Sequence, residues 1–335
     1  MIERYRHNKS FPIERGGELP ELEIAYSTYG KLNEQRDNVI WVCHALTANS
    51  EVDDWWPHTV EKGRFLDPEK WFVVCANILG SHYGTTGPLS VDPRTGEPYY
   101  DTFPKVTIRD MVNAHKILAD KLGIDRIHAL MGSSVGGFQA MEWAIMEPER
   151  INKLFLIATD TEVTPWVAGL NETQRMAIRA DKSYGKKSVE AGKEGMATAR
   201  AIGLLSYRGP SGYNLSQKNH EDMPDFSHRA TTYQNYQGEK LCNRFNAYSY
   251  MAILDAFDSH CVGRGRKSRE DALKEIKADT TCIGITTDIL FPPERMKKIA
   301  SEIAGAKYHE IESEFGHDGF LVEYEQLDRI IKSII

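Results

Sequence analysis

Residues 127–137 read Ile127-His128-Ala129-Leu130-Met131-Gly132-Ser133-Ser134-Val135-Gly136-Gly137. An apolar run leads into a glycine-rich turn, and a helix-like pattern of apolar residues follows and ends before Pro148. The turn carries the pattern Gly-x-Ser-x-Gly with Ser134 at its centre, because Met131 stands where Ser133 would need its first glycine. A serine on a tight turn between a strand and a helix is typical of a nucleophile elbow, so Ser134 is the candidate nucleophile.

The two glycines of this motif have a physical reason. The turn strains the backbone at the serine, and a Cβ two residues away on either side would collide with neighbouring chain, so Gly132 and Gly136 are required there. The pentapeptide alone also fits a plain glycine-rich turn. The predicted strand before it and the predicted helix after it favour the catalytic interpretation.

Short apolar runs bounded by turn residues recur along the chain, as expected for buried parallel strands. Six of these runs are predicted as strands, at residues 39–43, 71–75, 127–131, 154–158, 281–285 and, more weakly, 307–311. Helical periodicity falls between them, for example over residues 108–122 and from about residue 323 onward. Strands that alternate with helices predict an α/β fold with a mostly parallel, doubly wound sheet.

One long segment breaks this alternation. Residues 161–275 contain helices and polar loops but no convincing strand, and the strand pattern resumes at Thr281. We therefore predict a core formed by residues 1–160 and 276–335, with a helical lid domain inserted at residues 161–275. Active sites of open α/β sheets lie beyond the carboxyl ends of the strands, where this lid would sit.

Composition and charge exclude several classes of function. The 335 residues carry a formal net charge of −7, which argues against nucleic acid as a partner. No window of 18 apolar residues occurs, and the charged N-terminus lacks the apolar run of a signal peptide, so we expect no membrane segment and a cytoplasmic protein. Five cysteines without a Cys-x-x-Cys pair agree with reduced thiols. The sequence contains no metal-ligand motif, dinucleotide fingerprint or phosphate-binding loop, so no metal site is predicted.

A serine hydroxyl needs a base, and the chain order serine, acid, histidine is typical of this kind of elbow. His317 lies in a glycine-flanked loop after the last predicted strand, whereas His309 lies within a strand pattern and is interpreted as structural. Asp288 follows the fifth predicted strand, whereas Asp279 precedes it and would lie at the wrong edge. We predict Ser134 as nucleophile, His317 as general base and acid, and Asp288 as the residue that holds the imidazole tautomer. The alternative for Asp288 is a helix cap or a turn.

Acyl transfer at such a serine also needs two backbone N–H groups for the oxyanion. One would be the N–H of Val135, directly after the nucleophile. The other would come from the loop His44-Ala45-Leu46-Thr47-Ala48-Asn49, which follows the first predicted strand, and Leu46 is the candidate there. The alternative interpretation of this loop is a plain polar connection.

Nearly the whole chain resembles the homoserine O-acetyltransferases, a family of the α/β-hydrolase superfamily. The segments within residues 161–275 are the most specific part of this resemblance, because generic esterases lack them. The matching segments are 43–47, 77–80, 83–88, 103–112, 131–137, 174–181, 236–240, 244–250 and 316–321.

The resemblance implies an α/β-hydrolase fold and a ping-pong reaction. Ser134 would take the acetyl group from acetyl-CoA, the co-substrate, and the γ-hydroxyl of L-homoserine would then take it from the enzyme. This is the activating step of methionine biosynthesis. The resemblance implies no permanently bound cofactor, and relatives pair through their lids as homodimers.

The resemblance also implies substrate-binding residues. Arg200 and Tyr207 match a family spacing that faces the amino-acid substrate, and Asp318 matches an aspartate that holds its amine. Thr47, in the matching segment 43–47, is a further expected contact. A guanidinium suits the substrate carboxylate and a carboxylate suits the ammonium, which would position the hydroxyl. On the residues alone, an exposed helix charge is the favoured interpretation of Arg200, and Asp318 equally fits a helix cap.

Several alternatives stay open. Ala48 and Asn246 stand where many relatives carry Gly and Asp, and relatives also use a succinyl donor or a serine acceptor. A carboxylesterase or thioesterase would use the same triad, and a non-catalytic hydrolase-like binding module is a third class. The basic segment 264–269 could contact the anionic phosphates of CoA, but a solvated loop is the favoured interpretation.

Overall fold

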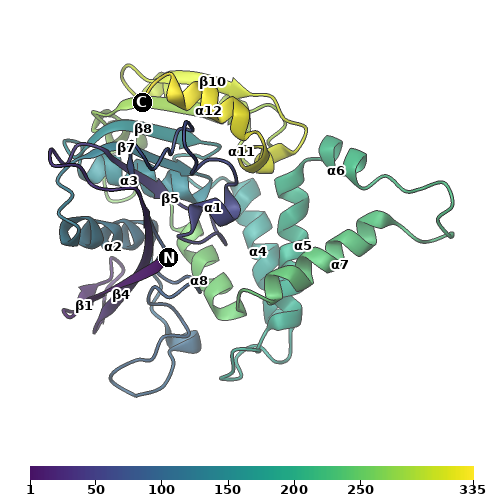
Figure 1. Ribbon diagram of the computed structural model, residues 1–335. Helices are drawn as coiled ribbons and strands as arrows, with labels where there is room; N and C mark the ends of the chain where they lie inside the picture. Colours follow the sequence, from purple (N-terminus) through teal and green to yellow (C-terminus); the bar gives the residue numbers. More distant parts are fainter.

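The computed structural model describes all 335 residues, and its centre is one large twisted sheet (Figure 1). The eight strands lie in the order β1 (Ile2–His7), β4 (Leu22–Tyr29), β6 (Phe72–Ala76), β5 (Val39–Cys43), β7 (Ile127–Ser133), β8 (Ile151–Ile157), β9 (Asp279–Ile285) and β10 (Lys307–Ile311). Only β4 runs antiparallel to its neighbours. The mostly parallel sheet confirms the predicted fold class. A separate short pair, β2 (Phe11–Pro12) and β3 (Glu18–Leu19), lies outside it.

All six predicted strands are present, and the structure adds β1 and β4 at one edge. Sequence reasoning missed these two because they lack a continuous apolar run. β1 is almost entirely exposed, and its Arg4 and Arg6 face Glu23 and Glu21 across the strand pair. An edge strand needs only one buried face, and charged side chains on it discourage pairing with other chains.

Helices cover both faces of the sheet, so its strands are buried on two sides. Successive residues of β5 alternate between two apolar cores, with Trp41 in the larger core and Ile40 and Val42 in the smaller. The larger core packs on α2, α3 and α10, and the smaller on α12 and residues 52–66. The bounds of these helices are α2 (Ile108–Lys121), α3 (Val135–Met146), α10 (Pro293–Glu302) and α12 (Tyr324–Lys332). Short helical turns complete the core, namely α1 (Val52–Trp55), η1 (Tyr100–Thr102), η2 (Gly316–Asp318) and α11 (Gly319–Val322).

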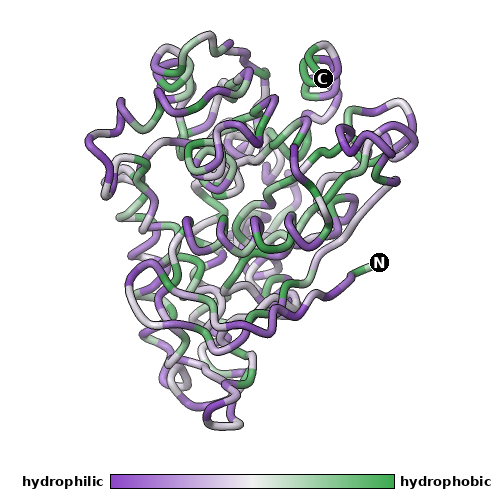
Figure 2. Tube along the Cα trace, turned by 90° about the vertical axis from the view of Figure 1, so that its left-hand side faces the viewer, coloured by the Kyte–Doolittle hydropathy of each residue, from purple (hydrophilic) through white to green (hydrophobic).

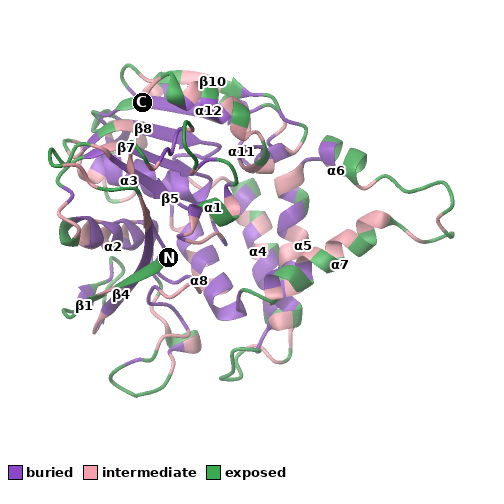
Figure 3. Ribbon diagram, viewed as in Figure 1, coloured by how far each residue is buried: buried purple, intermediate pink, exposed green.

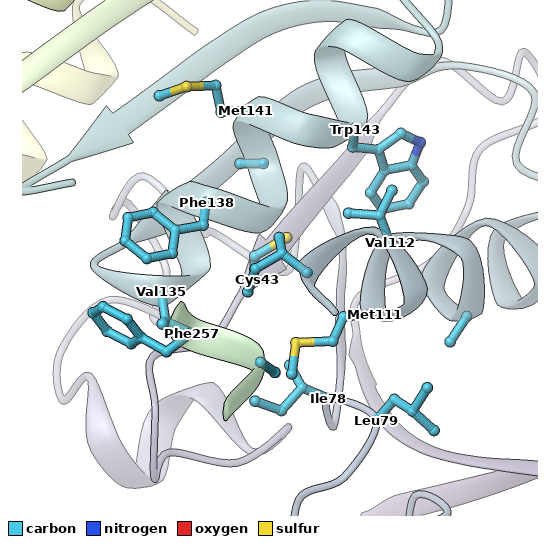
Figure 4. Packing of buried hydrophobic residues seen from close by; sticks show 14 of the residues in the cluster. Cys43, Ile78, Leu79, Met111, Val112, Val135, Phe138, Met141, Trp143 and Phe257 are labelled. Carbon is cyan, nitrogen blue, oxygen red and sulfur yellow. The ribbon is translucent and has the colours of Figure 1, made fainter. Parts of the chain in front are cut away.

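Six helices lie between β8 and β9, where sequence analysis predicted an insertion. They are α4 (Pro165–Ala180), α5 (Lys193–Arg208), α6 (Pro210–Ser216), α7 (Arg229–Cys242), α8 (Ala247–Asp258) and α9 (Arg269–Lys274). Helix α8 packs on the core through Phe257, whose ring lies 5.0 Å from that of Phe138 in α3 (Figure 4). Helices α5 to α7 project from the core, and the connection between α6 and α7 is exposed (Figures 1 and 3).

Hydrophobic segments lie mainly along the central strands, and hydrophilic segments lie mainly in the outer loops (Figure 2). The cysteines Cys43, Cys75 and Cys282 are buried, as their apolar surroundings in the sequence predicted, and no cysteine is paired. None of the helices combines the length and the apolar character needed to cross a membrane.

The arginines of the basic segment 264–269 form ion pairs, whereas the sequence favoured a solvated loop. Arg264 pairs with Glu14 at 2.7 Å, and Arg266 pairs with the buried Glu142 at 2.8 Å. Arg269 pairs with Glu302 at 2.7 Å. These three arginines are therefore held in ion pairs with carboxylates from other segments, and the favoured interpretation of a solvated loop is wrong for them. The carboxylates also compensate the charge that would attract CoA phosphates.

The turn between β7 and α3 is the tightest constraint in the core. Ser134 has φ 55° and ψ −127°, which is a rare backbone conformation for a residue with a Cβ. A Cβ on Gly132 would lie 2.1 Å from the carbonyl oxygen of Gly136, and a Cβ on Gly136 would lie 2.0 Å from that of Cys43. Both predicted glycine requirements are confirmed. Gly137 is a third, because its Cβ would lie 2.5 Å from Thr159.

This turn makes a steric test possible. We expect Gly136→Ala to lower the free energy of unfolding by about 4 kcal/mol or more, since its Cβ meets rigid backbone. The matched control is Gly169→Ala in α4, where an added Cβ meets nothing within 4 Å. That change should stabilise the protein by about 0.5–1 kcal/mol, the usual gain of Ala over Gly in a helix. Urea denaturation measures both values, and an unchanged Gly136→Ala variant would show that the turn relaxes freely.

Candidate active site

The strained turn at Ser134 is held by the neighbouring strand β8. The backbone N–H of Ser134 donates to the carbonyl oxygen of Ile157 at 3.0 Å, and Thr159 Oγ1 donates to the carbonyl oxygen of Ser134 at 2.8 Å. These bonds fix the residue in a conformation that it would not adopt alone. The turn therefore holds the hydroxyl beyond the carboxyl end of β7, at the edge of the sheet where the cavity opens.

Asp288 and His317 meet as the chain order predicted, although 29 residues separate them. His317 Nδ1 lies 2.8 Å from Asp288 Oδ2. Asp288 Oδ1 accepts backbone hydrogen bonds from Leu290 at 2.8 Å and Phe291 at 2.9 Å. Because a carboxylate accepts only, the proton of the neutral imidazole lies on Nδ1, which leaves a lone pair on Nε2. The two backbone bonds also form the local turn that was the alternative interpretation of Asp288. The same carboxylate therefore holds the turn with one oxygen and contacts His317 with the other.

The imidazole of His317 is buried among aromatic rings. Its centroid lies 5.4 Å from those of Phe291 and Phe320 and 6.0 Å from that of Tyr207. The rings limit rotation of the imidazole and keep bulk water from it. His309 lies within β10, in agreement with its structural interpretation.

Ser134 and His317 line the same cavity, which has a volume of about 400 Å³. Its wall comes from the loop after β5 and from helices α4, α5 and α7. No hydrogen bond joins Ser134 Oγ to His317 in this structure. Such bonds are often loose without substrate and tighten in the reacting complex.

The loop after β5 brings the candidate oxyanion donor to this cavity. Leu46 lines the cavity, and its backbone N–H donates to no acceptor in the protein. Val135 is the first residue of α3, so its N–H has no partner within the helix. A helix N-terminus also favours negative charge. Leu46 thus lines the same cavity as Ser134, Val135 directly follows Ser134, and the N–H groups of both can serve a ligand.

The substrate-binding candidates lie in the same cavity. Arg200 Cζ lies 5.6 Å from the centre of the Tyr207 ring, and no carboxylate lies within 4 Å of the guanidinium. Burial raises the pKa of Tyr207, so its hydroxyl stays protonated near neutral pH. Asp318 faces Arg208 Nε at 2.8 Å, a cation that sequence reasoning missed.

Thr47 is held by a second arginine that sequence reasoning missed. Arg244 Nη1 donates to the carbonyl oxygen of Thr47 at 2.5 Å, and Tyr83 Oη donates to the same oxygen at 3.4 Å. Arg244 follows α7, so it connects the inserted helices to the loop after β5. No local pattern separates Arg208 or Arg244 from the many arginines on helix surfaces, and only the resemblance marked the segment that contains Arg244.

Residues 38–324 match the family model for the alpha/beta hydrolase fold. A homoserine O-acetyltransferase from Cyclobacterium marinum is 45% identical over 97% of this chain and 92% of its own length. The crystal structure of a homoserine O-acetyltransferase from Bacillus anthracis superimposes with a TM-score of 0.91 at 25% identity, over 99% of this chain and 97% of that one. Esterase E22 superimposes with a TM-score of 0.89 at 24% identity, over 99% of both chains, which shows the fold alone. This chain belongs to the homoserine O-acetyltransferase family of α/β-hydrolase-fold proteins.

Proposed function

We propose that this enzyme transfers the acetyl group of acetyl-CoA to the γ-hydroxyl of L-homoserine through an acetyl ester on Ser134, as a step of methionine biosynthesis. The relatives support the substrate pair. The observation that carries the mechanism is the hydrogen bond from His317 to Asp288 beside a cavity that also contains Ser134. We place the reaction in the cytoplasm, where the five free cysteines would stay reduced.

In the first half-reaction, His317 Nε2 accepts the proton of Ser134 as the serine oxygen attacks the thioester carbonyl. Leu46 N–H and Val135 N–H stabilise the negative charge on the carbonyl oxygen. The bond from carbon to sulfur then breaks, and His317 returns the proton to the departing thiolate. Asp288 stabilises the imidazolium between these transfers.

In the second half-reaction, the γ-hydroxyl of homoserine replaces CoA. His317 accepts the hydroxyl proton as the oxygen attacks the acetyl ester, and the same two N–H groups receive the charge. The bond from carbon to the oxygen of Ser134 breaks, and His317 returns the proton to that oxygen. The serine is thereby regenerated, and O-acetylhomoserine leaves.

Selection of homoserine over water depends on contacts to the carboxylate and the ammonium group of the homoserine zwitterion. Arg200 has no carboxylate partner, so its guanidinium can receive the substrate carboxylate. Asp318 can receive the ammonium, although Arg208 already shares this carboxylate and weakens its charge. Tyr207 and Thr47 line the remaining wall. Two fixed ends hold the hydroxyl near the acetyl ester, which favours transfer over hydrolysis.

We propose that residues 161–275 act as a lid domain on a core formed by residues 1–160 and 276–335. Helices α4, α5 and α7 supply one wall of the cavity, while the catalytic residues all come from the core. The bond from Arg244 to Thr47 joins the two parts at the site itself.

We propose a homodimer that pairs through the projecting helices of this lid. Leu215, Phe226 and Tyr236 are exposed on α6, α7 and their connection, with 72%, 101% and 54% of their surface accessible. Large exposed apolar side chains that recur in one projecting segment favour an interaction surface there. Sedimentation equilibrium at micromolar concentration should give twice the monomer mass, and a monomer mass would contradict the pairing.

The proposed reaction is tested by release of free thiol from acetyl-CoA. We expect fast release that depends on L-homoserine, slower release with L-serine or with succinyl-CoA, and very slow release with water alone. Ser134→Ala should abolish thiol release under all of these conditions while keeping the circular dichroism spectrum. Release that homoserine does not accelerate would favour a thioesterase, and faster release with succinyl-CoA or serine would reassign the substrate within the family.

Arg200→Ala separates the two half-reactions. Removing the guanidinium should raise the KM for homoserine by about 10- to 100-fold, in line with about 1.5–3 kcal/mol for a hydrogen bond to a charged group. Acetylation by acetyl-CoA alone should stay within about twofold, since the acyl donor does not need this contact. The control is Arg179→Ala, which removes an arginine outside the cavity that pairs with Glu172. An equal loss in both half-reactions would contradict a role in carboxylate binding.

A further inference from the structure

The loop after β5 contains a buried histidine that the mechanism does not use. His44 is fully buried. Its Nδ1 lies 2.8 Å from the carbonyl oxygen of Ala45, and its Nε2 accepts the backbone N–H of Ile78 at 3.1 Å. Both ring nitrogens are therefore engaged by backbone, one in the candidate oxyanion loop and the other in the segment after β6.

These two contacts define the protonation of the ring. Because Ile78 N–H is a donor, Nε2 must present a lone pair, and the single proton of the neutral ring lies on Nδ1. Nδ1 then donates to Ala45. Burial lowers the pKa of His44 to about 4, so the ring stays neutral at physiological pH. His44 is thus a fixed hydrogen-bond donor to the loop and does not exchange protons during the reaction.

The bond to Ala45 determines where the next N–H points. The carbonyl group of Ala45 and the N–H of Leu46 belong to one planar peptide unit, in which the two groups point in opposite directions. A donor that holds the carbonyl oxygen at 2.8 Å therefore also fixes the direction of Leu46 N–H. The backbone N–H of Ala48 also donates to this oxygen, at 3.0 Å. Without the imidazole, that single bond of the turn would remain, and the peptide unit could rotate further about its flanking single bonds and turn the N–H away from the cavity.

We propose that His44 is a positioning residue of the oxyanion hole: its Nδ1–H holds the Ala45–Leu46 peptide so that Leu46 N–H faces the acyl carbonyl at Ser134. This inference rests on the proposed function in one respect, namely that Leu46 is an oxyanion donor. His44 does not touch the substrate. It acts only through the peptide that it holds.

A second buried layer joins His44 to the other oxyanion donor. Gln139 Nε2 donates to the carbonyl oxygens of Val135 at 3.1 Å and of His44 at 3.4 Å. Gln139 Oε1 accepts from His115 Nε2 at 2.8 Å, which orients the amide. Helix α3 and the loop after β5 are therefore connected through the side-chain amide of Gln139.

Two substitutions separate the two bonds of His44. In His44→Asn, the amide nitrogen takes the place of Nδ1 and can still donate to Ala45, but Ile78 N–H loses its acceptor. In His44→Gln, the longer amide reaches the place of Nε2 and can still accept from Ile78, but the side-chain donor to Ala45 is lost and only the N–H of Ala48 remains. If His44 is a positioning residue, His44→Gln should be the slower variant. If His44 is only structural, the two reaction rates should instead follow the stabilities of the two variants.

The experiment measures acylation and stability in both variants of the full-length enzyme. The burst of nitrophenolate from p-nitrophenyl acetate reports acylation of Ser134 and needs neither CoA nor homoserine. We expect the burst rate constant to fall about 10- to 100-fold in His44→Gln, up to the usual effect of losing one oxyanion donor, and to stay within about fivefold of wild type in His44→Asn. The KM for homoserine should stay within about twofold in both. Urea denaturation should nevertheless show His44→Asn to be the less stable variant.

Several results would overturn the inference. They are equal burst rates in the two variants, burst rates that follow stability, or a nitrogen-15 NMR spectrum that shows the proton of His44 on Nε2. The nitrophenyl ester also keeps this test separate from the proposed function. If wild-type enzyme is acylated by the ester but does not transfer acetyl to homoserine, the proposed function fails and the comparison of the two His44 variants still decides the inference.

Discussion

The backbone of Ser134 is the constraint on which the rest of this molecule depends. A residue with φ 55° between a buried strand and a buried helix is costly, and three neighbours hold it there. The strand β8 accepts its N–H, Thr159 holds its carbonyl group, and the chain at Cys43 approaches so closely that only glycine fits at position 136. The same close approach brings the loop after β5 beside the serine. The strained turn and the oxyanion loop are therefore consequences of one packing arrangement.

The order of strands explains how distant parts of the chain complete the site. In a parallel sheet, the carboxyl ends of β5, β7 and β9 lie at one edge, and the cavity opens there. Asp288 follows β9 and His317 follows β10, so both come from the chain after the inserted helices. The insertion leaves the sheet after β8 and returns before β9, which places its helices over the candidate catalytic residues without separating them.

The proposed division of labour follows from this arrangement. The core would perform acyl transfer with backbone N–H groups and a histidine–aspartate pair. The inserted helices would choose the acceptor, because they supply Arg200 and Tyr207. A fold by itself does not determine which reaction takes place, so the acceptor contacts carry this part of the proposal.

Most of the core could be predicted from the sequence, because apolar runs and glycines report backbone geometry directly. Ser134, Asp288 and His317 each follow a strand, so the parallel sheet brings them to one edge. β1 was missed because an edge strand does not need a continuous apolar run, and β4, the next strand in, was missed because polar residues interrupt its apolar ones. The partners Arg208 of Asp318 and Arg244 of Thr47 were missed for another reason. Long arginine side chains choose partners through tertiary contacts, and neither the spacing nor the local pattern encodes which carboxylate or carbonyl group is near.

The hydrogen-bonded network of the oxyanion loop was also beyond sequence reasoning. His44 lies beside residues that the motif marks, yet its two partners are Ala45, which is adjacent, and Ile78, which is 34 residues away. Only the folded structure shows that one imidazole ring contacts both residues.

The most direct measurement of the central claim is peptide mass spectrometry after rapid quenching of enzyme mixed with acetyl-CoA and no acceptor. We expect one added acetyl group on the peptide that contains Ser134, and its loss within one turnover when L-homoserine is added, with O-acetylhomoserine formed in equal amount. An acetyl group on another side chain, or one on Ser134 that homoserine does not remove, would contradict the account.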